Sequence, residues 1–206
     1  MSETIVGPDG KARCRWCAAA PEFLGYHDSE WGFPVGDDRQ LFEKLCLESF
    51  QSGLSWRTIL AKRENFRAAF QGFDFDRMAR FTQRDVDRLL QDAGIVRHRG
   101  KIEAAISNAK VYLELKQRMS LSAFLWDFVN GEPVQNRFAR VDDIPAQTDV
   151  SQAMAKALKA QGFRFCGPTT VAAFLQSVGL ANDHLVDCHR YETCNELANA
   201  FKAPQE

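Results

Sequence analysis

The chain has 206 residues, with 26 Lys and Arg against 27 Asp and Glu, and hydrophobic residues make up 45% of it. This composition excludes a disordered chain, a collagen-like repeat and a coiled coil, and the length predicts one globular domain over 1–206. No apolar run reaches the ~18 residues of a membrane-crossing helix, and the first residues do not resemble a secretory signal. Six cysteines in such a chain indicate thiols or metal ligands rather than a disulfide framework.

Charge is distributed unevenly along the chain. Residues 57–110 carry 12 Lys and Arg against 7 Asp and Glu, whereas the remainder carries 14 against 20. The densest basic cluster is Arg97–Lys101. Such a cluster either binds phosphate groups or forms an ordinary solvated helix surface, and the second interpretation is the more common one.

Apolar residues recur with helical spacing along nearly the whole chain, and no stretch alternates as a half-buried strand would. Asp or Thr at helix starts and Gly at helix ends mark most boundaries. The pattern therefore predicts an all-α fold. The expected helices run from Asp37 to about Ser52, Trp56 to Arg63, Asp74 to Phe81, Thr82 to Gly94, Ile102 to Leu113, Phe124 to Gly131, Ser151 to Gly162 and Pro168 to Gly179, with an irregular segment at 132–149.

Glu48 is unusual because it lies on the apolar face of its predicted helix, seven residues after Leu41 and three after Leu45. A buried carboxylate requires a partner or a function. Aromatic rings are more often simple core residues, but a carboxylate among rings is what a pocket for a purine or a cation needs. The aromatic residues considered with it are Trp16, Tyr26, Trp31 and Trp56.

Possible metal ligands lie near both ends of the chain. Cys14 and His27 precede the first long helix, and His184 and Cys188 are four residues apart, so on a helix they share a face. Two Cys and two His would complete a tetrahedral structural zinc site. Ordinary thiols and surface histidines are the alternative. The rival ligands are Cys17, His189 and Cys194.

The segment Gly162–Gly167 joins two predicted helices and is followed directly by Pro168. Backbone N–H groups of such a tight turn, together with the start of the next helix, can bind a phosphate. An ordinary helical hairpin has the same pattern, so this signal is weak by itself.

Four strings combine these features: GYHDSEWG at 25–32, LESFQSGLSW at 47–56, DAGIVRHRGKI at 92–102 and GLANDH at 179–184. Together they resemble the signature of the DNA-3-methyladenine glycosylase I family, bacterial enzymes of alkylation repair. The resemblance runs from about Arg13 to Tyr191. It leaves out residues 1–12 and 192–206, which we expect to be flexible tails.

The resemblance implies a helix–hairpin–helix DNA glycosylase fold whose two ends are joined by a structural Zn²⁺. It implies a monofunctional enzyme that flips 3-methyladenine out of double-stranded alkylated DNA, hydrolyses its N-glycosidic bond and leaves an abasic site. It also implies a monomer that works in the bacterial cytoplasm, at the nucleoid, without a membrane partner.

The residues that match the family fall into three groups. The zinc ligands are Cys14, His27, His184 and Cys188. The base pocket has Glu48 as the catalytic carboxylate that reads adenine, Tyr26 and Trp56 as rings that sandwich the base, and Trp16 and Trp31 nearby. The DNA contacts are Gly53, Leu54 as the wedge that fills the gap in the duplex, Gly162, Gly167 and Thr169.

One further acidic residue and two other functions remain open. Asp187 lies 20 residues after Gly167, where many helix–hairpin–helix glycosylases carry an Asp that activates water. It is either catalytic or a surface residue between two zinc ligands. The second function considered is a module that binds damaged DNA without catalysis. The third, a zinc hydrolase, needs an open metal position that a Cys₂His₂ set does not leave.

Overall fold

The computed structural model describes residues 3–204, and most of them are helical, as predicted. The α-helices are α1 (Pro21–Ser29), α2 (Asp38–Gln51), α3 (Trp56–Ala61), α4 (Arg63–Ala69), α5 (Phe75–Met78), α6 (Gln83–Gln91), α7 (Arg99–Leu115), α8 (Leu121–Trp126), α9 (Asp149–Gln161), α10 (Pro168–Ser177) and α11 (Arg190–Ala200). The 3₁₀ turns are η1 (Arg15–Ala19), η2 (Gln71–Phe73), η3 (Asp127–Val129) and η4 (Val141–Asp143). The strands are β1 (Thr4–Val6), β2 (Ala12–Cys14), β3 (Val134–Gln135) and β4 (Ala181–Asn182).

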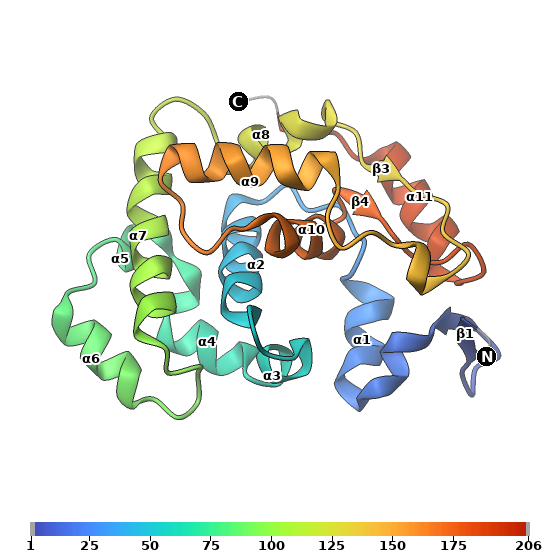
Figure 1. Ribbon diagram of the computed structural model, residues 1–206, viewed down its shortest axis with the longest axis horizontal. Helices are drawn as coiled ribbons and strands as arrows, with labels where there is room; N and C mark the ends of the chain where they lie inside the picture. The colour runs from blue at the N-terminus through green and yellow to red at the C-terminus, as the bar shows by residue number, and fades with distance from the viewer. Residues whose placement is uncertain (1–2, 205–206) are drawn as a thin grey trace.

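Helix α2 is the centre of the molecule, with α10 lying against it and α7 and α8 packed around it (Figure 1). Every residue from 41 to 50 is buried, including four with polar or charged side chains. A helix that is buried on all sides must satisfy each of those groups within the protein. The way α2 does so determines the site described below.

Several predicted helix starts are confirmed by their capping hydrogen bonds. The carboxylates of Asp37 and Asp74 accept from backbone N–H groups three residues on, and Thr82 begins a capping box with Asp85. The helix predicted to open at Ser151 begins earlier, because Thr148 is its N-cap and Ser151 is the third residue of the capping box.

Of two helix ends predicted at glycines, one is confirmed and the other is wrong. Gly162 ends α9 as predicted, in the left-handed conformation that a helix C-terminus favours (φ +102°). Gly94 does not end α6, which stops at Gln91 with Asp92 as its C-cap. Asp92 Oδ1 instead accepts the backbone N–H of Gly94 across a short turn.

Both segments that we expected to be flexible tails contain secondary structure. Strands β1 and β2 form an antiparallel hairpin, with Ile5 opposite Arg13. Helix α11 buries Tyr191, Cys194 and Ala198 along one face. Three-residue strands are too short to show alternation, whereas the buried residues of α11 follow the three- and four-residue spacing of a helix face.

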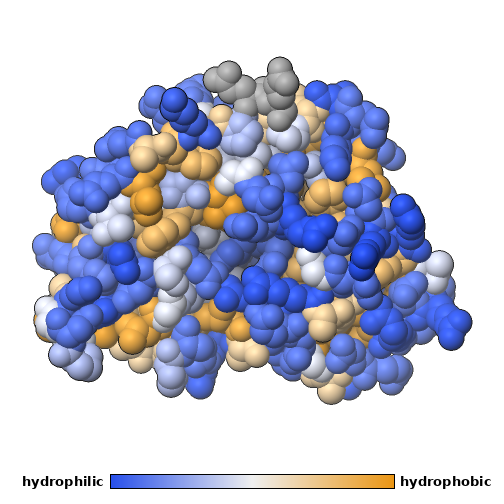
Figure 2. All heavy atoms as spheres, turned by 180° about the vertical axis from the view of Figure 1, so that it is seen from behind, coloured by the Kyte–Doolittle hydropathy of each residue, from blue (hydrophilic) through white to orange (hydrophobic). Residues whose placement is uncertain are grey.

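Helices α1 and α11 and strand β1 gather on one side of the molecule, while α4–α7 form the opposite side (Figure 1). The backbone N–H of His189 donates to Ala12 O at 2.8 Å, which ties the C-terminal segment to β2. Hydrophilic side chains cover most of the face seen from behind, with hydrophobic ones in separate patches (Figure 2). Among the described residues, no helix has the length and apolar character needed to cross a membrane.

The turn after α10 brings two backbone segments into contact. Gly179 has φ +68°, and a Cβ there would lie 2.3 Å from the carbonyl carbon of Phe33. Any side chain would therefore push apart the segments before α2 and after α10. The glycine places the C-terminal part of the chain directly against the N-terminal part.

Candidate active site and metal-ligand cluster

A pocket of about 410 Å³ opens between α1, α2, α3, α10 and the segment around η4. It brings together Glu48 and all four aromatic residues singled out in the sequence, together with Thr169. Its remaining wall comes from residues to which sequence reasoning gave no role. The complete lining is Trp16, Tyr26, Trp31, Glu48, Gln51, Trp56, Val141, Ile144, Pro145, Ala146, Thr169, Ala172, Ala173 and Gln176.

Glu48 differs from the other buried charges of α2. Glu43 pairs with Arg67 at 2.7 Å and Lys44 pairs with Glu30 at 3.3 Å, whereas Glu48 makes no ion pair within residues 3–204. Its side chain is buried, with the residue 4% exposed. Burial raises the pKa of Glu48 from 4.5 to about 7, against the opposing effects of the nearby Lys44 charge and a hydrogen bond from Ser177.

Two of the rings around Glu48, those of Tyr26 and Trp56, lie next to each other. The centroids of Tyr26 and Trp56 are 5.3 Å apart, with 44° between the ring planes. Stacked bases are spaced about 3.4 Å apart, so a base between two parallel rings holds them about 7 Å from each other. Tyr26 and Trp56 therefore contact each other directly in this structure, and their role as rings that sandwich the base stays a prediction.

The remaining rings divide by accessibility. Trp16 and Trp56 are half-buried, whereas Tyr26 and Trp31 are buried. Burial and the adjacent Glu48 raise the pKa of Tyr26 well above 10, so its hydroxyl keeps its proton. The indole Nε1 of Trp56 is buried without a hydrogen-bond partner in the described part of the chain. The pocket thus presents two accessible ring faces and two N–H or O–H donors.

The turn after α2 holds Leu54 at the surface, where its residue is 41% exposed. The backbone N–H of Leu54 donates to Gln51 O at 2.7 Å, and Gly53 has φ +77°. The ammonium group of Lys101 donates to the carbonyl oxygens of Phe50 and Ser52. Lys101 is buried, so it supports this turn from inside instead of belonging to an exposed basic loop.

Two other residues of the basic cluster at Arg97–Lys101, His98 and Arg99, also have partners within the protein. Arg99 pairs with Asp87 at 3.3 Å and with Glu103 at 3.4 Å. His98 is the N-cap of α7, where its Nδ1 accepts from Lys101 N. Most of the cluster therefore serves the start of α7.

The Gly162–Gly167 turn joins α9 to α10 and is held from two sides. Asn108 accepts from Arg164 N at 2.8 Å and donates to Arg164 O at 3.1 Å. Ser49 of α2 donates to Phe165 O at 3.0 Å. Pro168 is the first residue of α10 and Gly167 its N-cap, as the sequence indicated. The two holding residues were not predicted, because nothing local marks a partner so distant in sequence.

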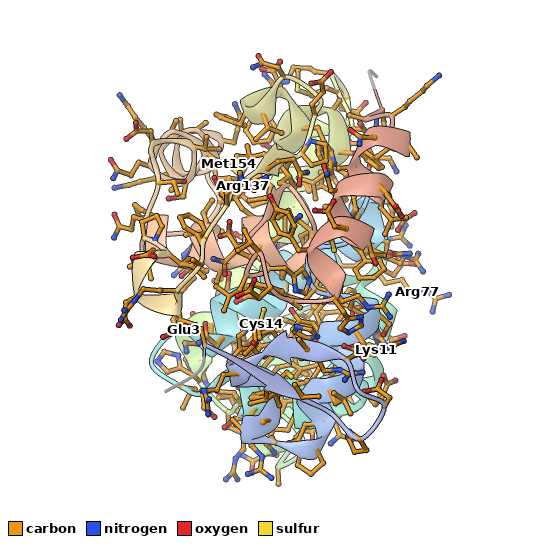
Figure 3. All side chains as sticks on the ribbon, turned by 90° about the vertical axis from the view of Figure 1, so that its right-hand side faces the viewer. Glu3, Lys11, Cys14, Arg77, Arg137 and Met154 are labelled. Carbon is orange, nitrogen blue, oxygen red and sulfur yellow. The ribbon has the colours of Figure 1, made fainter. Side chains whose placement is uncertain are left out.

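Cys14, His27, His184 and Cys188 converge, as the two-ended ligand set predicts (Figure 3 labels Cys14). All four are buried and their ligand atoms lie within 4.8 Å of one another. Three of the Cys–His distances are 3.5–3.7 Å: Cys14 to His184, and Cys188 to both histidines. A zinc tetrahedron with Zn–S and Zn–N bonds of about 2.3 and 2.0–2.1 Å has S–N edges of about 3.6 Å. The donor set therefore fits a four-coordinate zinc ion.

The histidine nitrogens that face away from the cluster also have partners. His27 Nδ1 lies 2.8 Å from Asp28 Oδ1, and His184 Nε2 lies 2.9 Å from Trp31 O. Arg13 in turn donates to both carboxylate oxygens of Asp28. Such outer contacts fix the ring orientation of metal-binding histidines.

The structure places the rival metal ligands and Asp187. Cys17 and Cys194 are buried outside this cluster, and His189 contacts Asp28 at 3.2 Å. His184 and Cys188 lie in a turn and not on a shared helix face. Asp187 is exposed in the same turn, and the described residues that line the pocket do not include it.

Proteins of known function resemble the chain over most of its length. A methyladenine glycosylase family model matches residues 16–191. Escherichia coli (strain K12) DNA-3-methyladenine glycosylase 1 is 48% identical over 180 residues, which cover 87% of this chain and 96% of that protein. A crystal structure of 3-methyladenine DNA glycosylase I has a TM-score of 0.84 at 50% identity, covering 86% of this chain and 98% of the other. A variant of 3-methyladenine DNA glycosylase I in complex with 3-methyladenine has a TM-score of 0.83 at 41% identity, covering 86% and 96%.

The helical fold with its carboxylate-bearing aromatic pocket is that of a DNA glycosylase. Within that class, the chain belongs to the methyladenine glycosylase family.

Proposed function

We propose that this chain flips 3-methyladenine out of double-stranded DNA and hydrolyses its N-glycosidic bond, releasing the free base and leaving an abasic site. The observation that carries the proposal is Glu48, a buried carboxylate that has no ion-pair partner within residues 3–204 and lines an aromatic pocket. Family membership and the relatives' names support the same substrate.

The chemistry of the substrate suits this pocket. Methylation at N3 makes the base cationic while it is attached to the sugar, and the base leaves as a neutral purine, so strong acid catalysis is unnecessary. A cation is attracted to aromatic faces by roughly 0.5–2 kcal/mol, and stacking adds about 1–3 kcal/mol. The base stacks against the accessible rings of Trp16 and Trp56, with Tyr26 and Trp31 behind them.

Glu48 performs two tasks in this arrangement. Its ionised carboxylate accepts a hydrogen bond from the exocyclic amine of adenine, and its negative charge stabilises the cationic base. Binding of a cation lowers the pKa of Glu48 and so favours the ionised form. The Tyr26 hydroxyl and the Trp56 N–H are the donors available to ring nitrogens of the base.

DNA is held by the surface around the pocket mouth. Leu54 enters the space left by the flipped base, an apolar wedge that offsets part of the unstacking cost. The Gly162–Gly167 turn is a helix–hairpin–helix motif whose backbone N–H groups bind a phosphate, together with Gly167 and Thr169 at the start of α10. Gly53 allows the wedge turn to approach the strand closely.

Cys14, His27, His184 and Cys188 hold a structural zinc ion. When bound, the ion supplies no reaction step, because four protein ligands fill its coordination sphere. It joins the N-terminal segment to the C-terminal one beside α1. We also propose that the protein acts as a monomer in the bacterial cytoplasm.

The test is to incubate the protein with methylated duplex DNA and to identify the released bases by chromatography. Release of 3-methyladenine, absent in Glu48→Gln, is the expected result. Binding to this DNA without release of any base would favour the non-catalytic module. Release of 7-methylguanine at a similar rate would refute the proposed selectivity for adenine.

A further inference from the structure

One helix face of α10 forms a wall of the pocket, and Gln176 is its last residue. Thr169, Ala172, Ala173 and Gln176 follow the three- and four-residue spacing of a single face. Gln176 also lines a neighbouring cavity of about 260 Å³, behind the pocket, together with Asp183 and Asn136. It is therefore the polar side chain that separates the two spaces.

The amide of Gln176 is held in one orientation. Its Nε2 donates to Asp183 Oδ2 at 2.7 Å, and Asn136 Nδ2 donates to Asp183 Oδ1 at 2.7 Å. Asp183 is 6% exposed and lines only the second cavity of the two. An ionised carboxylate only accepts hydrogen bonds, so a reversed amide would place two acceptors against each other.

This orientation leaves the amide oxygen free. The Oε1 atom of Gln176 has no hydrogen-bond partner in the part of the chain that the structure describes. Because the amide nitrogen turns toward Asp183, the oxygen is the end of the amide left for the base pocket. At Gln176, the α10 wall of the pocket thus offers an acceptor and not a donor.

A fixed hydrogen-bond acceptor matters because Glu48 alone does not require a donor at position 6 of the base. Without a bound cation, the pKa of Glu48 is raised to about 7, so its carboxyl group is partly protonated near neutral pH. A protonated carboxyl donates a hydrogen bond, so it would tolerate the 6-oxo group of a guanine-type or hypoxanthine-type base. The 6-amino group of adenine has two N–H donors and can satisfy two acceptors.

We propose that Gln176, held by Asp183, is a specificity-determining residue whose Oε1 accepts a hydrogen bond from the 6-amino group of the flipped base. A 6-oxo purine would place its oxygen against this acceptor and bind more weakly. Asp183 is a positioning residue, since it acts only through the amide of Gln176. The inference rests on the proposed excision of 3-methyladenine.

The test compares two free bases that differ at position 6, 3-methyladenine and 3-methylhypoxanthine. Their affinities are measured through the fluorescence of the pocket tryptophans, for wild type, Gln176→Leu and the matched control Gln117→Leu at an exposed site. Wild type and the control prefer 3-methyladenine. We expect Gln176→Leu to reduce that preference roughly tenfold, the effect of one lost hydrogen bond.

Asp183→Asn provides the second measurement, because an amide at 183 accepts either orientation of Gln176. We expect it to reduce the preference in the same direction, with zinc content and thermal unfolding measured because His184 is adjacent. If Gln176→Leu weakens both bases equally, or changes neither affinity, the inference is overturned. Failure of wild type to release 3-methyladenine from methylated DNA would instead defeat the proposed function.

Discussion

The base pocket and the metal-ligand cluster share α1, yet their polar atoms have different environments. In the cluster, both histidine nitrogens that face outward have partners, Asp28 and the Trp31 carbonyl. In the pocket, Glu48 has a hydrogen bond from Ser177 but no ion pair among the described residues. The Trp56 Nε1 and the Gln176 Oε1 have no hydrogen-bond partner there. The cluster completes its own structure, whereas the pocket keeps groups available for a ligand.

The contrast is sharpest at two consecutive residues of α1. Tyr26 lines the pocket and His27 belongs to the cluster. Neighbouring residues of a helix point about 100° apart, so one short helix serves both regions. The residues proposed for stability and those proposed for substrate recognition are therefore neighbours in the structure. Variants in the cluster should change stability, and variants in the pocket should change recognition.

The largest expected effect is the fall in stability when the metal is lost. Cys188→Ala, or a strong chelator, should lower the free energy of unfolding on the order of 5 kcal/mol, because zinc binding contributes directly to folding. Zinc content and urea unfolding would measure it. Cys17→Ala, buried outside the ligand set, should keep one zinc per chain. An equal loss of zinc in both variants would contradict the assignment.

Next in size is the effect of Glu48→Gln on catalysis. The neutral amide lacks the negative charge that stabilises the positive charge developing on the sugar as the base leaves, so the single-turnover excision rate should fall about 10²–10³-fold with the fold retained. Circular dichroism would confirm folding. The matched control is Glu43→Gln on the same helix, which breaks the ion pair with Arg67 and should reduce stability without changing the excision rate. Unfolded Glu48→Gln protein would show that Glu48 is structural.

A third effect is the pH dependence of stability. The pKa of Glu48 rises from 4.5 to about 7 on folding, so the folded state holds this proton more tightly. The resulting stabilisation is fully present below pH 4.5 and is lost as pH rises through 7. Wild type should lose about 2.5 kcal/mol relative to Glu48→Gln between pH 5 and 8. If the difference in unfolding free energy between wild type and Glu48→Gln were the same at both pH values, the raised pKa would be contradicted.

The smallest effect concerns the support of the wedge turn. Lys101→Met removes the donor to the Phe50 and Ser52 carbonyls while keeping most of the side-chain volume. We expect a loss of about 1–3 kcal/mol in stability. The excision rate from duplex DNA should also fall, with binding of free 3-methyladenine unchanged. Arg99→Met at the exposed ion pairs nearby should leave both quantities close to wild type.

The sequence was informative at most positions where a local rule applied, although Gly94 did not end its helix. Capping residues such as Asp37 and Thr82, and the terminator Gly162, correctly placed their helices. The position of Glu48 on an apolar helix face indicated a pocket, because a buried charge on a regular element is visible from residue spacing alone. The convergence of the four Cys and His residues was also predicted.

What the sequence did not predict depends on contacts between distant segments. Gln176 lies on α10, but only the fold places Asp183 beside it to fix its amide. Lys101 looked like part of a basic surface, and only packing shows that its ammonium group is buried against α2. The direct contact between Tyr26 and Trp56 likewise depends on how α1 meets α3.

The cluster joins residues near the two ends of the chain, which gives the protein a mechanical property. Force applied between the termini would pass through Cys14 and Cys188 when the ion is bound, and residues 15–187 would lie outside the load path. The α-helices from α1 to α10 fall within this protected loop. In a single-molecule pulling experiment, the hairpin and α11 should extend first, and the helices should follow only after a metal–ligand bond breaks.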